Sequence, residues 1–104
     1  MCSQNKRRSL TAERVFGSLP GIEARSAGTE NNARIKVTAG MLCWADVIFT
    51  MEKKHTRRIS ERYRSELQGK DVVCLYISDD YEYMDEQLIE ILRDKVAGHI
   101  GGCP

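Results

Sequence analysis

Hydrophobic residues recur along the chain with two alternating patterns, one typical of helices and one typical of strands. A spacing of three and four predicts helices over residues 9–19, just after Thr38, over 52–67 and over 85–97. Ser9 is the expected cap of the first helix, and Gly98 is the expected stop of the last. Ile59, Tyr63 and Leu67 lie four apart in a heavily charged segment, which predicts a long helix exposed over most of its surface.

Runs rich in β-branched and apolar residues predict the strands, which cover residues 22–26, 47–51 and 72–77. The last run is almost entirely apolar, as expected for a parallel strand that is covered on both faces. Helices and strands alternate along the chain. The pattern therefore predicts an α/β fold with three layers and a short parallel sheet.

The chain is short and nearly neutral, which restricts the classes of function. Its 104 residues allow one small domain, so we expect a single domain over residues 1–104. The net charge of +1 points neither to nucleic acid nor to an acidic membrane surface. The longest uncharged apolar run, residues 41–45, is too short to cross a bilayer. The basic N-terminus lacks a following apolar stretch of signal-peptide length, which predicts a cytoplasmic protein.

The cysteines and histidines indicate neither a metal site nor a disulfide framework. They are Cys2, Cys43, Cys74, Cys103, His55 and His99, and none has ligand spacing. We expect Cys43 and Cys74 to be small buried hydrophobes and both histidines to lie at the surface. Cys103 is expected to be a free thiol, and a role as resolving partner of Cys2 stays open. The basic residues over 53–64 predict a solvated helix face.

The first predicted helix follows directly on a short segment with a distinctive pattern. The pattern is a cysteine, five loop residues, an arginine and a serine. They are Cys2, Ser3, Gln4, Asn5, Lys6, Arg7, Arg8 and Ser9. A loop of this length directs backbone N–H groups inward, and the following helix adds its positive dipole end, which predicts a phosphate-binding cradle. The Arg8 guanidinium can hold two phosphate oxygens, with the Cys2 sulfur beneath the phosphorus. These N–H groups and a hydrogen bond from the Ser9 hydroxyl favour the thiolate.

Four blocks of sequence, in this order, extend the pattern beyond the cradle. They are Cys2-x5-Arg8-Ser9 with Thr11-Ala12-Glu13, Arg25-Ser26-Ala27-Gly28-Thr29, Ala45-Asp46-Val47-Ile48-Phe49-Thr50-Met51, and Asp79-Asp80-Tyr81. Together they resemble the low-molecular-weight protein tyrosine phosphatases, above all the family's short bacterial branch. The resemblance implies a flavodoxin-like fold and hydrolysis of phosphorylated proteins or small aryl phosphates through a cysteinyl phosphate. It implies no metal and no organic cofactor.

The resemblance also implies roles for individual residues. The catalytic residues would be Cys2 as nucleophile, Arg8 as holder of the phosphoryl oxygens and Asp79 as general acid. Asp80 stands where the family has proline, and it stays the alternative acid. Asn5 matches the asparagine that maintains the cradle, and Tyr81 matches an aromatic residue at the substrate entrance.

The sequence departs from the family at its start and around the substrate entrance. Only Met1 precedes Cys2, whereas the family's nucleophile ends a buried first strand. We therefore expect that strand to be missing, the segment 22–26 to lack its neighbour, and the cradle to lose one anchor. Either translation starts upstream, or the product is a truncated form. Glu82 replaces a second aromatic residue, and residues 30–38 are shorter than the family's substrate-recognition segment.

Two other functions remain open alongside hydrolysis. The first is a degenerate phosphatase that binds phosphate or a partner without turnover, which the missing strand and Asp80 suggest. The second is an arsenate reductase, which needs two further cysteines in a mobile segment. Cys74 is expected in a strand and Cys103 stands alone, so the arsenate reductase is the weaker alternative. The sequence gives no indication of the oligomeric state or of the physiological substrate.

Overall fold

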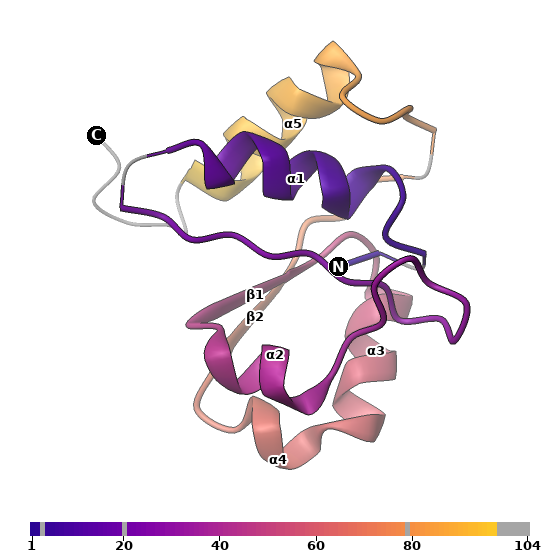
Figure 1. Cartoon of the computed structure of the whole chain (residues 1–104), viewed down its shortest axis with the longest axis vertical. Helices are drawn as coiled ribbons and strands as arrows, with labels where there is room; N and C mark the ends of the chain where they lie inside the picture. The colour runs from indigo at the N-terminus through magenta and orange to yellow at the C-terminus, as the bar shows by residue number, and fades with distance from the viewer. Residues whose placement is uncertain (3, 20, 79, 98–104) are drawn as a thin grey trace.

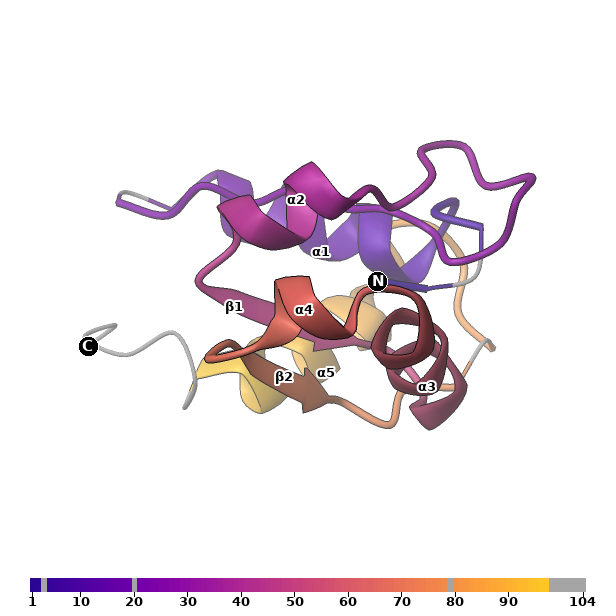
Figure 2. The same cartoon turned by 90° about the horizontal axis from the view of Figure 1, so that it is seen from below.

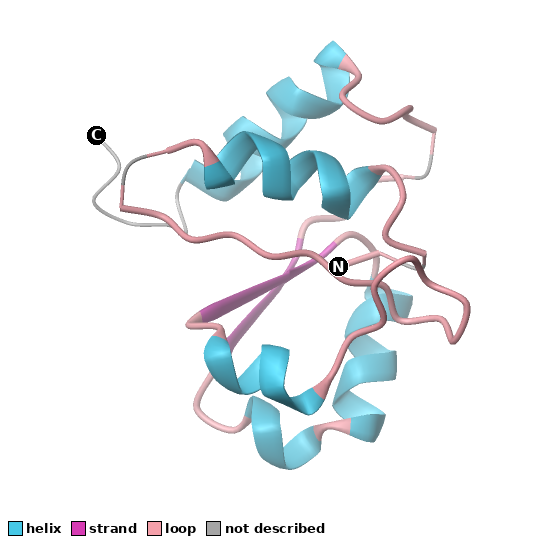
Figure 3. Ribbon diagram, in the orientation of Figure 1, coloured by secondary structure: helices cyan, strands magenta, loops and turns pink. Residues whose placement is uncertain are grey.

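A computed structural model of the chain describes residues 1–2, 4–19, 21–78 and 80–97. Within these residues, helices and strands follow in the order α1 (Arg8–Gly17), α2 (Ala39–Trp44), β1 (Val47–Thr50), α3 (Lys53–Arg62), α4 (Arg64–Leu67), β2 (Asp71–Cys74) and α5 (Glu86–Ala97). Figure 3 shows that the described residues of the long connection from α1 to α2 are loop. None of the helices in the described part of the chain has the length and apolar content that a membrane span requires.

Strands β1 and β2 run parallel, with Val47 opposite Asp71 at the start of the register. Hydrogen bonding continues past the ends of both strands, because Ile77 N–H donates to the Met51 carbonyl at 2.7 Å. Strand β2 ends before the predicted residue 77. Tyr76 has a φ of 54°, a left-handed conformation that does not fit a regular strand.

The first two residues lie along the free edge of β1 and continue the sheet. The Met1 nitrogen donates to the Phe49 carbonyl, and Met51 N–H donates to the Met1 carbonyl at 2.9 Å. On its other side, Cys2 forms an isolated parallel bridge with Gly28. These contacts hold the start of the cradle in place, so the expectation that it loses one anchor is wrong.

Helices cover both faces of this narrow sheet. Figures 1 and 2 show α1 and α5 on one face and α2, α3 and α4 on the other. Two clusters of buried side chains correspond to the two faces. One comprises Cys2, Val15, Phe16, Met51, Leu75, Ile77, Leu88, Leu92 and Val96, and the other Ala27, Val37, Leu42, Ile48 and Ile59. The predicted three-layer α/β fold with a short parallel sheet is therefore confirmed.

The predicted strand over residues 22–26 is not formed. Residues 22–27 have no strand conformation, although Gly28 forms bridges with Cys2 and Lys36. A cavity of about 760 Å³ separates this segment from β1, with Ala24 and Val47 among its lining residues. The segment thus lacks the neighbouring strand that its backbone needs for pairing, as the sequence suggested.

The single helix predicted over residues 52–67 is divided into α3 and α4. Tyr63 interrupts it with φ −128° and ψ 40°, and the Tyr63 hydroxyl donates to the Val37 carbonyl at 3.3 Å. Both helices keep an exposed, charged outer surface, while Ile59 is buried and Leu67 is half-buried. The interruption follows from this long-range contact, which the local spacing of apolar residues does not encode.

Several local predictions have clear outcomes. Thr38 caps α2, the helix predicted just after it, with its Oγ1 accepting a hydrogen bond from Met41 N–H at 3.3 Å. The prediction that Ser9 caps α1 is wrong, because α1 begins at Arg8 and Ser9 lies within it. Cys43 is exposed rather than buried, because it lies on the outer face of the short helix α2, and Cys74 is half-buried. The predictions for Gly98, His99 and Cys103 concern positions outside the described residues.

Candidate active site

The loop from Cys2 to Arg8 is fixed at its first residue by two backbone hydrogen bonds and at its last by α1. Cys2 N–H donates to the Ala27 carbonyl at 3.4 Å, and the Cys2 carbonyl accepts from Thr29 N–H at 2.9 Å. Asn5 has a φ of 57°, a left-handed conformation that asparagine adopts more readily than most residues. The loop therefore turns back on itself, and the start of α1 follows directly.

Three buried side chains form a hydrogen-bonded row inside the loop. The Cys2 Sγ lies 2.9 Å from the Ser9 Oγ, and the Asn5 Nδ2 donates to the same Ser9 oxygen at 2.8 Å. The row continues to the surface through Arg34, whose Nη2 donates to the Asn5 Oδ1 at 3.0 Å and whose Nε donates to the Asn5 carbonyl at 3.1 Å. The sequence indicated the first three residues, but it contained no signal for Arg34.

The environment of the Cys2 thiol favours its ionisation. Burial raises the pKa of the thiol. Four other interactions together lower it by more: hydrogen bonds from the side chain of Ser9, from the backbone of Ser9 and from the backbone of Asn5, and the charge of the Met1 ammonium. The resulting pKa lies below the ordinary value for cysteine. A lowered pKa increases the fraction of thiolate at a given pH, and the thiolate is the nucleophilic form of cysteine.

The Arg8 side chain is almost completely buried and is held by two acceptors. Its Nη1 donates to the Glu52 Oε2 at 2.6 Å and to the Ile77 carbonyl at 2.7 Å. Both of these hydrogen bonds use Nη1, and a guanidinium holds an oxyanion in a bidentate manner through two N–H groups. The guanidinium is thus oriented by residues that lie far away in the sequence.

Glu52 and His55 connect the cradle to the start of α3. Glu52 is the N-cap of α3, its carboxylate accepts from the His55 backbone N–H, and its own N–H donates to the His55 Nδ1 at 3.0 Å. Hydrogen bonding with Arg8 is the main reason that the pKa of Glu52 is lowered. Burial and the nearby Arg8 charge lower the pKa of His55 to about 4. The prediction that His55 lies at the surface is wrong. Its ring is buried, and its Nδ1 accepts the capping hydrogen bond from Glu52 N–H.

Of the two candidates for the general acid, only one lies in the described part of the chain. Asp79, like Ser3 of the cradle, lies outside the described residues. Asp80 is exposed, and its Oδ2 accepts a hydrogen bond from the Ser78 hydroxyl at 2.8 Å. The choice between Asp79 and Asp80 as the acid therefore stays a prediction.

The segment that follows these carboxylates lies beside the cradle. The Arg7 guanidinium is 3.9 Å from the Glu82 carboxylate, and Met84 N–H donates to the Thr11 hydroxyl of α1 at 2.9 Å. Tyr81 is half-buried and packs against the cluster between α1 and α5 rather than standing free. Its role at a substrate entrance stays a prediction.

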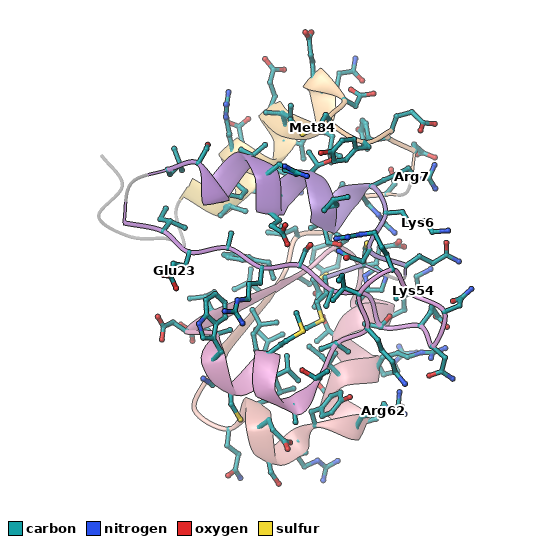
Figure 4. All side chains as sticks on the ribbon, viewed as in Figure 1. Lys6, Arg7, Glu23, Lys54, Arg62 and Met84 are labelled. Carbon is teal, nitrogen blue, oxygen red and sulfur yellow. The ribbon has the colours of Figure 1, made fainter. Side chains whose placement is uncertain are left out.

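The outer surface of the cradle is basic. Gln4 and Lys6 are exposed, and Arg7 is half-buried. Figure 4 shows Lys6, Arg7 and Lys54 projecting from the same side of the molecule, away from Glu23. Within the described residues, no group of three or more His, Cys, Asp or Glu side chains could hold a metal ion. The arrangement is suited to binding an oxyanion through arginine and backbone N–H groups.

Comparison with solved structures identifies the fold. The chain is similar to the tyrosine phosphatase Wzb from Escherichia coli K30 in complex with phosphate, with 21% identity and a TM-score of 0.71 over 93% of this chain and 90% of that chain. It is similar to the Erwinia amylovora tyrosine phosphatase AmsI, with 22% identity and a TM-score of 0.74 over 95% of this chain and 87% of that chain. No protein-family model matches the sequence, and no curated protein matches it.

These similarities agree with the resemblance that the sequence motifs suggested. The matched structures are bacterial tyrosine phosphatases, and each alignment covers nearly the whole of both chains. At 21% and 22% identity, such a likeness establishes the fold and leaves the activity to be tested. The chain therefore has the flavodoxin-like fold of the low-molecular-weight protein tyrosine phosphatases.

Proposed function

We propose that the protein hydrolyses phosphomonoesters of the protein-tyrosine or aryl type through a cysteinyl-phosphate intermediate. The observation that carries the proposal is the Cys2 thiol, which lies 2.9 Å from the Ser9 hydroxyl at the start of α1 and has a lowered pKa. Arg8 ends the same loop, and its Nη1 is held by Glu52. Nucleophile and phosphate-binding groups thus belong to one preorganised loop.

The proposed reaction has two steps. In the first, the Cys2 thiolate attacks phosphorus, a sulfur–phosphorus bond forms and the bond to the leaving aryl oxygen breaks. Arg8 and the loop N–H groups stabilise the charge on the remaining oxygens, while Asp79, or alternatively Asp80, protonates the leaving oxygen. In the second, the resulting carboxylate removes a proton from water, which attacks phosphorus and releases inorganic phosphate and the thiolate.

The similar structures and the charge at the surface of the cradle also support this proposal. The similar proteins are tyrosine phosphatases, and one of them was solved in complex with phosphate. The exposed Lys6 and half-buried Arg7 place positive charge beside the cradle, where a dianionic substrate approaches. The proposed chemistry uses no metal ion, and the expected substrates are phosphorylated proteins or small aryl phosphates.

Hydrolysis of para-nitrophenyl phosphate in the presence of a metal chelator tests the proposal. Cys2→Ser should abolish turnover, whereas Cys43→Ser, which changes an exposed cysteine on α2, should keep it. Arg8→Lys retains the charge without the bidentate fork, and it should lower kcat/KM by about 100-fold or more. Asp79→Asn and Asp80→Asn identify the acid by which one loses activity.

Three results would contradict the proposal. Equal rates for the unmodified protein and Cys2→Ser would show that no cysteine mechanism operates. Phosphate binding by calorimetry without turnover would favour the non-catalytic phosphate-binding protein, and thiol-dependent reduction of arsenate would favour the reductase.

A further inference from the structure

Arg34 lies on an exposed loop, and both its side chain and its backbone N–H donate hydrogen bonds to the cradle. Its guanidinium donates through Nε to the backbone carbonyl of Asn5 and through Nη2 to the Asn5 Oδ1, at 3.1 Å and 3.0 Å. In addition, Arg34 N–H donates to the Gln4 carbonyl at 2.9 Å. Three hydrogen bonds therefore attach Arg34 to the middle of the cradle, although Arg34 lies 29 positions after Asn5 in the sequence.

These contacts determine which way the Asn5 amide points. An arginine can only donate hydrogen bonds, so the Asn5 atom that faces it has to be the oxygen. The Nδ2 of the amide is then directed at the Ser9 hydroxyl, which it reaches at 2.8 Å. Asn5 is completely buried, so water cannot supply an alternative partner for a reversed amide.

The orientation of Asn5 in turn determines what the Ser9 hydroxyl can do. The Ser9 oxygen accepts from Asn5, so its single hydrogen is available for the Cys2 sulfur 2.9 Å away. If the amide were reversed, its oxygen would compete for that hydrogen, and the thiolate would lose a donor. A thiolate can only accept hydrogen bonds, so it is stabilised when this row of hydrogen bonds runs from Asn5 through Ser9 toward the sulfur.

We propose that Arg34 is a positioning residue that sets the direction of the hydrogen bonds from Asn5 to Ser9 and from Ser9 to Cys2. Arg34 touches neither the sulfur nor the phosphate position, and it acts through the two buried side chains. The inference deepens the proposed function, since it rests on Cys2 as the nucleophile. It assigns control of that nucleophile to the loop between α1 and α2.

Other charged groups also act on the Cys2 thiol and have to be separated from Arg34. The Met1 ammonium favours the thiolate directly. The Arg8 guanidinium interacts electrostatically with that ammonium and with the buried His55. Arg7 and Glu82 pair with each other at the edge of the cradle. Variants of Arg34 leave all of these groups in place, so a change in the pKa of the Cys2 thiol reports on Arg34 alone.

The rate of Cys2 alkylation by iodoacetamide as a function of pH measures the thiol pKa without requiring turnover. The measurement uses a Cys43→Ser, Cys74→Ser, Cys103→Ser background, in which Cys2 is the remaining cysteine. Arg34→Met removes both the charge and the fork, whereas Arg34→Lys keeps the charge but cannot hold both Asn5 oxygens in the same way. We expect both variants to raise the pKa of Cys2 by about one unit, which lowers the alkylation rate below that pKa roughly tenfold.

Matched controls separate positioning from charge and from folding. Lys36→Met removes a positive charge from an exposed residue of the same loop and should leave the pKa unchanged. In a Ser9→Ala background, the row is already broken, so Arg34→Met should have no further effect. Circular dichroism verifies that each variant is folded.

Two outcomes would overturn the inference. If Arg34→Lys keeps the pKa of the unmodified protein while Arg34→Met raises it, Arg34 acts through its charge alone. If Arg34→Met shifts the pKa equally with and without Ser9, the row of hydrogen bonds is not involved. Because alkylation needs no substrate, an inactive protein would contradict the proposed function without deciding the role of Arg34.

Discussion

His55 is a titratable side chain that the fold buries in its neutral form. Its Nδ1 accepts a hydrogen bond from Glu52 N–H, and only about 1% of the residue is exposed. Burial, followed by the charge of Arg8, lowers the pKa of His55 from 6.5 to about 4. Protonation would place a second cation beside Arg8 and would remove the acceptor of the capping hydrogen bond.

This burial predicts that the protein loses stability as the pH falls. Between 6.5 and about 4, the unfolded chain binds a proton at His55 and the folded chain does not, so the free energy of unfolding decreases with decreasing pH. From about pH 7 to about pH 5, the contribution of His55 is a loss of about 2 kcal/mol. Urea unfolding at both values measures it.

The comparison with His55→Gln isolates this contribution. Glutamine can accept the Glu52 hydrogen bond but does not titrate, so the variant should show a smaller loss over the same pH interval. The Met1 ammonium, whose pKa is lowered to about 6, titrates in both proteins, so the difference retains only its interaction with His55. An identical pH dependence in the two proteins would show that His55 is not held neutral.

Individual site residues could be predicted only where their neighbours in space are also neighbours in sequence. The spacing of Cys2, Arg8 and Ser9 predicts a loop around an oxyanion, because one short segment supplies all three. Arg34 lies 29 positions after Asn5 and Glu52 lies 44 positions after Arg8, and no local pattern predicts that either of them contacts this loop. The Glu52-x-x-His55 spacing is a variant capping box, and it is the signal in the sequence that marks the start of α3.

At the scale of elements, the start of α3 joins the sheet to the cradle. Glu52 follows β1 almost directly, caps α3 and holds the Nη1 of Arg8 at 2.6 Å. Shortening the Glu52 side chain separates its capping of α3 from its contact with Arg8. Aspartate is among the preferred N-cap residues, but its carboxylate is one methylene shorter and cannot keep the same contact with Arg8.

We therefore expect Glu52→Asp to keep the stability of the protein and to lower its activity. The melting temperature should change little, whereas kcat for para-nitrophenyl phosphate should fall about tenfold, because the guanidinium is less well oriented. Glu61→Asp, an exposed change within α3, is the matched control and should affect neither quantity. A normal kcat in Glu52→Asp would show that the Ile77 carbonyl alone suffices to hold Arg8.

Elements were predictable where the local pattern is dense and a partner exists in the fold. Strand β1 and helix α5 lie within two residues of their predicted bounds, since each has an apolar face that packs against the core. Residues 22–26 have a plausible strand sequence, but a strand also needs a hydrogen-bonded neighbour, and the cavity occupies that position. The division at Tyr63 depends on a contact with Val37, which sequence periodicity cannot report.

At the scale of the whole molecule, the core is unevenly packed. The cluster between α1 and α5 contains Leu88 and Leu92, which are fully buried. The cavity of about 760 Å³ lies between α1, the loop after it, α2 and β1, so side chains that line it have packing partners on one side only. Stability should therefore depend on the two regions to different degrees.

Truncation of two aliphatic side chains of equal size tests this difference. Leu92→Ala should lower the free energy of unfolding by about 2–5 kcal/mol, because it empties a closely packed site. Ile22→Ala should lower it by about 1 kcal/mol, because Ile22 is half-buried and already borders the cavity, where it loses fewer contacts. A domain of this size has a total stability of roughly 5–15 kcal/mol, so the first change removes a large part of it. Urea unfolding of both variants measures the two values. Equal losses would show that Ile22 is packed as closely as Leu92, which contradicts the uneven packing of the core.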